Sequence, residues 1–89
     1  MAAVTHITVL YFAHLREQLG LASEALTLEG QDWTIARLQE HLRARGGVYA
    51  QVLANGKAVR AALNQTMVSE TTVITDGAEI AFFPPVTGG

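Results

Sequence analysis

The fold is decided near the start of the chain, by the run His6-Ile7-Thr8-Val9-Leu10-Tyr11-Phe12. β-Branched and aromatic residues dominate this run, and such a composition predicts a buried opening strand. Because side chains alternate along a strand, the odd-numbered residues from Ile7 to Tyr11 share one face. The even-numbered residues from Thr8 to Phe12 share the opposite face, so both faces of this strand carry apolar groups.

After this strand, the sequence predicts a short helix, a second strand and a longer helix. Leu15 and Leu19 have helical spacing, and Gly20 is well placed to end the first helix. Residues 23–28 alternate as a strand does. Thr34 can cap the longer helix through its hydroxyl, and we expect Gly46-Gly47 to end that helix.

The second half of the chain contains shorter segments joined by turns. Turn chemistry is present at Asn55-Gly56, Asn64-Gln65-Thr66 and Asp76-Gly77. The expected segments around these turns are a weak helical turn over residues 48–54, short strands over 59–63 and 67–68, and a final strand over 78–83.

The order of these elements predicts an α+β fold of the β-grasp, or ubiquitin-like, type. A mixed sheet would then pack on one main helix in a single domain over residues 1–83, with residues 84–89 as a C-terminal tail. A ferredoxin-like sandwich is the chief alternative. That fold requires a second long helix late in the chain, and the sequence predicts none there.

Composition excludes several classes of function. The chain has 89 residues, 49% of them hydrophobic, which fits one globular domain with a modest core. It has no cysteine, so disulfides, thiolate metal sites and Cys nucleophiles are excluded. A net charge of −2 without a basic cluster disfavours nucleic acid, and no apolar run is long enough to cross a membrane. We expect a soluble cytoplasmic protein.

Conventional active-site patterns are absent from the sequence. His6, His14 and His41 lack the spacing of a metal pair, so we expect no metal site. Asn55-Gly56-Lys57 lacks the remaining residues of a phosphate-binding loop. Carboxylates such as Glu24 have no partner that the sequence specifies, and we expect them to be exposed. We therefore assign no side-chain catalyst and no tightly bound cofactor.

The C-terminal tail, Pro84-Pro85-Val86-Thr87-Gly88-Gly89, is the unusual feature of the sequence. Pro84 and Pro85 cannot donate backbone hydrogen bonds, and they hold the chain extended where it leaves the last strand. Gly88 and Gly89 lack Cβ atoms and can enter a narrow cleft, which makes the Gly89 carboxylate accessible to an enzyme. The alternative is a frayed chain end without a function.

The chain resembles the small subunits of molybdopterin synthases, which are ubiquitin-like sulfur carriers with the β-grasp fold. Residues 10–17, 62–68 and 75–89 carry this resemblance, while residues 21–56 add only a compatible length. The most specific part is the ending Phe82-Phe83-Pro84-Pro85-Val86-Thr87-Gly88-Gly89, because a terminal Gly-Gly alone also occurs in ubiquitin and in the thiamine-pathway carrier.

The resemblance implies a cycle of sulfur transfer through the Gly89 carboxylate. An E1-like adenylating enzyme uses ATP and magnesium to form an acyl-adenylate, and a sulfur-donor protein converts it to a thiocarboxylate. The large subunit of the synthase then takes up the loaded tail, and sulfur passes to cyclic pyranopterin monophosphate. This chain would be the sulfur-donating subunit of a heterotetramer, without catalytic activity alone.

The resemblance also implies which residues contact the partners. Phe12, Met67 and Phe83 match apolar positions that pack on the large subunit and, alternately, on the adenylating enzyme. Strand alternation agrees, because it turns Phe83 outward if Phe82 faces the core, although burial of both rings is the alternative. Arg16 matches a family position too, but a solvated charge explains it equally well. The partner-binding set is completed by Pro84, Pro85, Val86 and Thr87.

Other functions use the same terminal chemistry and remain open from the sequence. In a thiamine-type or tRNA-thiolation carrier, the sulfur would go to another acceptor. In a ubiquitin-like modifier, the activated Gly89 would be joined to a lysine amine of a target protein. A purely structural module would leave Gly89 unmodified.

Overall fold

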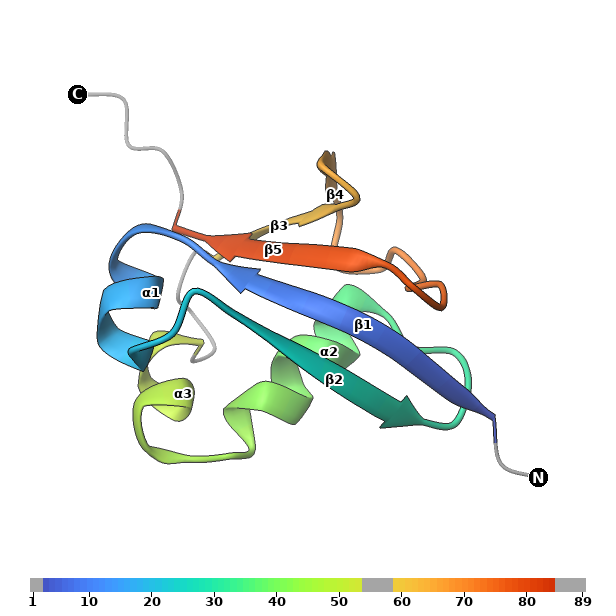
Figure 1. Ribbon diagram of the computed structural model, residues 1–89, viewed down its shortest axis with the longest axis horizontal. Coiled ribbons are helices and arrows are strands. Elements are labelled where there is room, and N and C mark those ends of the chain that lie inside the picture. Colours follow the sequence, from blue (N-terminus) through green and yellow to red (C-terminus); the bar gives the residue numbers. More distant parts are fainter. Residues whose placement is uncertain (1–2, 54–58, 85–89) are drawn as a thin grey trace.

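A curved mixed sheet with helices against one of its faces forms the architecture of this protein (Figure 1). The computed structural model describes residues 3–53 and 59–84. The elements in chain order are β1 (Val4–Tyr11), α1 (Ala13–Leu19), β2 (Ser23–Glu29), α2 (Ile35–Arg43), α3 (Gly47–Val52), β3 (Arg60–Leu63), β4 (Thr66–Val68) and β5 (Glu79–Phe83).

The sheet has five strands in the order β2-β1-β5-β3-β4. β1 and β5 run parallel, with Thr8 opposite Glu79 and Tyr11 opposite Phe82, whereas the other neighbouring strands are antiparallel. The first and last strands of the chain therefore lie side by side in the interior of the sheet (Figure 1). This mixed α+β arrangement confirms the predicted β-grasp class.

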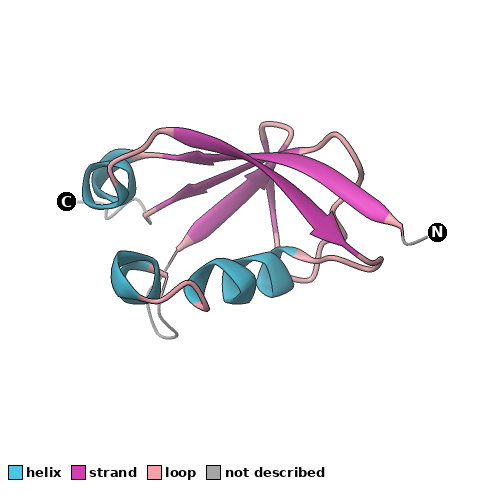
Figure 2. Cartoon of the chain, turned by 60° about the horizontal axis from the view of Figure 1, so that its bottom comes forward, coloured by secondary structure: helices cyan, strands magenta, loops and turns pink. Residues whose placement is uncertain are grey.

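The core lies between one face of the sheet and the helices. Val9 from β1 and Phe82 from β5 are 0% exposed, as are Leu38 and Leu42 from α2. Figure 2 shows α2 and α3 below the sheet, with α1 at its end. The sequence predicts a buried opening strand with apolar groups on both faces, but only the face of Ile7, Val9 and Tyr11 is buried, whereas the even-numbered face of β1 is largely exposed.

The main helix, α2, starts as the sequence predicts but ends earlier. Its N-cap is Thr34, whose hydroxyl accepts a hydrogen bond of 3.1 Å from the backbone N–H of Arg37. The prediction that Gly46-Gly47 ends this helix is wrong, because α2 ends at Arg43. The two glycines instead have positive φ angles, +77° and +56°, and turn the chain into α3, of which Gly46 is the N-cap.

The hairpin between β3 and β4 is tighter than expected. Asn64 and Gln65 both have positive φ angles, 49° and 71°, which is typical of a two-residue hairpin turn. Thr66 belongs to β4 rather than to the turn, because it pairs with Leu63. The expected turn at Asn55-Gly56 lies outside the described residues. None of the helices described here is both long and apolar enough to span a bilayer.

Candidate functional site: an apolar face beside the tail

The outer face of the sheet carries an apolar row at the end from which the tail leaves. The strand register places Leu10 of β1 opposite Ala81 of β5, Ala81 opposite Ala62 of β3, and Ala62 opposite Met67 of β4. Met67 is 52% exposed, whereas Ala62 between its neighbours is buried. Four strands thus contribute to one continuous apolar row, and Met67 is its most exposed member.

Two phenylalanines extend this row toward the tail. Phe12 follows β1, Phe83 ends β5, and their ring centroids lie 6.5 Å apart at an interplanar angle of 82°. Such edge-to-face contacts are favourable between aromatic rings. Phe12 is 44% exposed, Phe83 is half-buried and Phe82 is 0% exposed. The alternation predicted for β5 is therefore confirmed. Phe12, Phe83 and Met67 share one face with Leu10, Ala62 and Ala81, and these six residues are called here the docking face.

The backbone around Phe12 fixes the position of its ring. The N–H of Phe12 donates to the carbonyl of Phe82 at 3.1 Å, which extends the pairing of β1 with β5 by one residue. Ala13 then adopts a φ of 55°, in the left-handed region that non-glycine residues rarely occupy. The chain turns sharply into α1 at this residue, and Phe12 stays at the edge of the docking face.

The opposite half of the outer face is polar. Thr8 of β1 and Glu79 of β5 lie opposite one another there. His6 lies on the same face of β1, two residues before Thr8. The backbone N–H of His6 donates to Asp76 Oδ1 at 2.7 Å, and its Nδ1 lies 3.2 Å from the same oxygen. These hydrogen bonds hold the pKa of Asp76 below its usual value. The larger apolar side chains therefore gather in the half of the outer face that adjoins the tail, whereas Val4, 43% exposed, lies alone at the far end of β1.

A partly buried polar network lies behind the docking face, and the sequence does not reveal it. The Glu24 carboxylate accepts hydrogen bonds from Tyr11 Oη and Tyr49 Oη, both at 2.9 Å, and from Arg45 Nη1 at 2.8 Å. Burial alone would raise the pKa of Glu24, but these donors outweigh it and lower the pKa below its ordinary value. The expectation of an exposed Glu24 is wrong, since only 16% of its side chain is exposed.

This network joins parts of the chain that are distant in sequence. Glu24 lies in β2, Tyr11 ends β1, Tyr49 lies in α3, and Arg45 precedes that helix. Burial and the bond to Glu24 raise the pKa of the Tyr11 hydroxyl, so that hydroxyl stays protonated and donates. The network anchors α3 beneath Tyr11, the residue before Phe12, and thus supports the docking face from behind.

The remaining candidates fall in two groups. Arg16 is exposed on α1, and its side chain has no hydrogen bond or ion pair within the part of the chain that the structure describes. Pro84, half-buried, directly follows β5. The other tail candidates, Pro85, Val86, Thr87, Gly88 and Gly89, lie outside the described residues.

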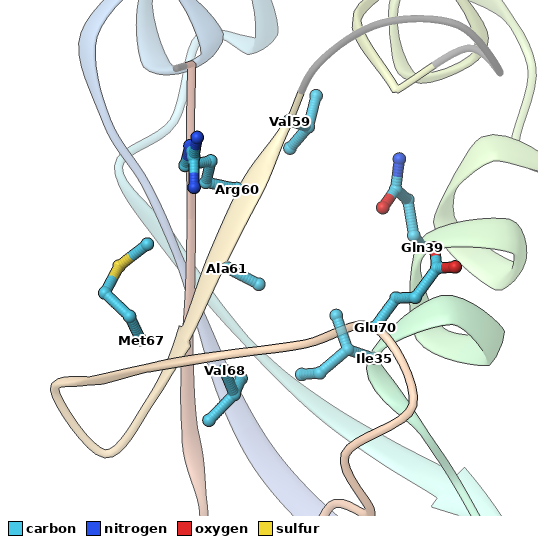
Figure 3. A pocket seen from close by; sticks show the side chains of 8 residues that line it. All are labelled: Ile35, Gln39, Val59, Arg60, Ala61, Met67, Val68 and Glu70. Carbon is cyan, nitrogen blue, oxygen red and sulfur yellow. The ribbon is translucent and has the colours of Figure 1, made fainter. Parts of the chain in front are cut away.

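A hollow of about 320 Å³ opens between α2 and the β3–β4 hairpin (Figure 3). Figure 3 shows Val59, Ala61 and Val68 on the side of the hairpin that faces α2, while Arg60 and Met67 point to the other side. The hollow therefore meets the docking face at its rim. Over residues 3–53 and 59–84, no group of three or more His, Cys, Asp or Glu side chains could hold a metal ion.

The fold and the docking face define a β-grasp protein with an apolar surface where β5 ends, and its sequence continues from there to Gly88-Gly89. The ThiS family model matches residues 9–89, and the chain belongs to the ThiS family. It is 45% identical over 83 residues to the molybdopterin synthase sulfur carrier subunit of Escherichia coli (strain K12), covering 93% of this chain and 99% of that protein. The corresponding subunit of Haemophilus influenzae is 42% identical over 83 residues, with the same coverage of both chains.

Solved structures share the fold. The solution structure of the Haloferax volcanii HVO 2177 protein is 26% identical, has a TM-score of 0.79, and covers 97% of this chain and 88% of its own. A complex of subunits 1 and 2 of molybdopterin-converting factor from Helicobacter pylori 26695 contains a chain that is 23% identical, with a TM-score of 0.61. That match covers 96% of this chain and 100% of the other.

Proposed function

We propose that this chain is the sulfur carrier and small subunit of a molybdopterin synthase, and that the Gly89 carboxylate carries the sulfur. The observation that carries the proposal is the 45% identity to a molybdopterin synthase sulfur carrier subunit, over 99% of that protein. The outward-facing Phe12, Met67 and Phe83 support it, because a carrier must present a surface that its partners recognise.

The proposed cycle begins with activation of Gly89. Its carboxylate oxygen attacks the α-phosphorus of ATP on an E1-like adenylating enzyme, pyrophosphate leaves, and Mg²⁺ is bound to the nucleotide there. The terminal sulfur of a protein persulfide then attacks the acyl carbon and AMP leaves. A second thiol cleaves the resulting acyl disulfide and is itself oxidised to a disulfide, so that a thiocarboxylate remains on Gly89.

The loaded tail then enters the large subunit, where sulfur is transferred to cyclic pyranopterin monophosphate in two rounds to form the dithiolene of molybdopterin. The large subunit supplies the acid and base groups for this reaction, and the carrier supplies and positions the nucleophile. Alone, the carrier is not a catalyst, and ATP and magnesium are needed only by the activating enzyme. We propose that the cycle takes place in the cytoplasm, where ATP is available to the activating enzyme.

The docking face is the proposed contact surface for both partners in turn. Phe12, Met67 and Phe83 pack on the large subunit, and Pro84 with the residues after it leads the tail into the active site. Arg16 lies on α1, next to this face, and is the weaker candidate. The complex solved for the Helicobacter pylori protein supports a large-subunit partner, and we propose a heterotetramer with two copies of each subunit.

Mass spectrometry tests this function directly. After incubation with a cognate adenylating enzyme, ATP, magnesium and a sulfur source, the intact chain should gain the mass difference between one sulfur and one oxygen. An unchanged mass, with the enzyme active on a known carrier, contradicts sulfur carriage.

Genetic rescue identifies the acceptor of the sulfur. In carrier-deficient strains, this chain should restore molybdenum-enzyme activity and not thiamine synthesis. The reverse result would favour a thiamine-type carrier, restored tRNA thiolation would favour a tRNA-thiolation carrier, and isopeptide conjugates in cells would favour a protein modifier.

A further inference from the structure

Arg60 is an isolated cation within the apolar surroundings of the docking face. It is the first residue of β3, is exposed, and pairs in the sheet register with Phe83. Among residues 3–53 and 59–84, no side chain or carbonyl forms a hydrogen bond or ion pair with its guanidinium. Glu70 lines the same hollow, yet the two do not form an ion pair.

The position of Arg60 places it between two anchors of the proposed interface. Phe83 is its direct neighbour on β5. Met67 is its diagonal neighbour on β4, because Met67 pairs with Ala62, two residues further along β3. Diagonal neighbours on one face of a sheet lie about 7–8 Å apart, within reach of a long side chain. Figure 3 shows that Arg60 and Met67 point to the same side of the hairpin.

A partner that covers both Phe83 and Met67 must therefore also cover Arg60. Removing a guanidinium from water without an acceptor is costly, and a buried cation is tolerated when it is paired and hydrogen-bonded. This chain supplies no acceptor among its described residues. The planar fork of arginine donors matches a carboxylate in a bidentate arrangement.

We propose that Arg60 determines the specificity and orientation of docking by pairing with an Asp or Glu side chain of the large subunit. That carboxylate lies beside the pocket for Phe83, at the entrance of the cleft that receives the tail. Because the pair forms at one position only, on the β3 side of Phe83, it fixes the direction in which the apolar row is laid on the partner. This inference rests on the proposed function, which names the partner.

The test measures binding of the full-length chain to the large subunit by calorimetry, without nucleotide. Arg60→Gln should weaken binding by about 3- to 10-fold, and Arg60→Glu by more, because it places two carboxylates together. Arg60→Lys should recover part of the affinity, since a lysine keeps the charge and loses the bidentate geometry. Added salt should weaken binding of the wild type more than binding of Arg60→Gln.

Arg37→Gln is the matched control. It removes the same charge from α2, in the helical layer on the other side of the sheet, where Arg37 packs over Trp33. Equal affinities of wild type and Arg60→Gln would overturn the inference, as would equal losses in Arg60→Gln and Arg37→Gln. An effect of Arg60→Gln on ATP-dependent adenylation alone would also overturn it, because the acceptor would then be a phosphate. If the wild type does not bind the large subunit, the proposed function is wrong and this inference fails with it.

Discussion

The two faces of the sheet near the tail consist of alternate residues of the same strands, yet only one of them is covered. On the inner face, which packs against the helices (Figure 2), Val9, Ile80 and Phe82 are 0% exposed. On the outer face, Leu10, Ala81 and Phe83 are half-buried, and no helix of the described chain lies over them. The inner face explains why the chain folds. The outer apolar residues lie outside that core, and the proposed partner gives them a function.

The largest effect expected from this comparison is on stability. Phe82→Ala should lower the free energy of unfolding by about 3–5 kcal/mol, because it leaves a cavity in the core. Phe83→Ala should lower it by less than about 1.5 kcal/mol, since a half-buried ring loses mainly its edge contact with Phe12. Urea unfolding of both variants measures the difference.

Phe83 should matter more for binding to the partner than for stability. Phe83→Ala should weaken binding to the large subunit by about 2 kcal/mol if its ring is a buried anchor of the interface. Calorimetry of the folded variant provides this value. Wild-type affinity would remove Phe83 from the interface and would leave the apolar outer face without an explanation.

Changes in the C-terminal tail should affect activity strongly and stability hardly at all. Deleting Gly89 displaces the terminal carboxylate by up to roughly 3.5 Å, and a misplacement of about 1 Å can already cost ~100-fold in rate. Molybdopterin formation should therefore fall by at least ~100-fold, while the free energy of unfolding changes by no more than ~0.5 kcal/mol. Replacing Gly88 with a bulky residue should act similarly. A truncated chain that still yields product contradicts the proposed role of Gly89.

The smallest effect concerns the polar network behind the docking face. At neutral pH, Glu24→Gln should cost about 1–2 kcal/mol of stability, because charged acceptors strengthen the bonds from Tyr11, Tyr49 and Arg45. The lowered pKa of Glu24 means that the unfolded state binds its proton more readily. Its contribution is therefore present above the ordinary value of 4.5 and is lost as the pH falls below it.

Urea unfolding at neutral pH and at about pH 3 tests this contribution. Glu24→Gln should lose less stability on acidification than the wild type does. Glu40→Gln is the control, since Glu40 is 75% exposed and lies 3.9 Å from Arg43 in a surface pair. Such pairs contribute less than about 1 kcal/mol. Identical acid dependence of Glu24→Gln and wild type would show that the network does not stabilise the fold.

Local patterns were sufficient to predict most of the fold. Alternation in residues 6–12 and 78–83 identified which residues share a face, and the hydroxyl of Thr34 identified the start of α2. The end of α2 was missed because Gly46 and Gly47 can either end a helix or connect two helices, and tertiary contacts decide between these. The direction in which Phe83 points was predictable for the same reason as the core, namely strand alternation.

Features that depend on distant residues were not predictable from the sequence. Glu24 looks like a surface carboxylate, since its three donors lie at Tyr11, Arg45 and Tyr49, and only the folded sheet brings them together. The role proposed for Arg60 was not predictable for a similar reason. It depends on the register of Arg60 with Phe83 and on its diagonal position to Met67, which require the order of the strands.

The docking face can form only after β5 has been synthesised, because β5 lies in the interior of the sheet. During synthesis, β1, β2, β3 and β4 are made first, but β1 and β3 cannot join the same sheet until β5 lies between them. Pairing between such distant segments makes folding slow and dependent on late residues. A ribosomal product that stops before residue 79 would lack the strand that unites the sheet and would not assemble Phe12, Met67 and Phe83 into one surface. If the large subunit recognises the docking face as proposed, interrupted translation products should not bind it, because they never acquire this surface.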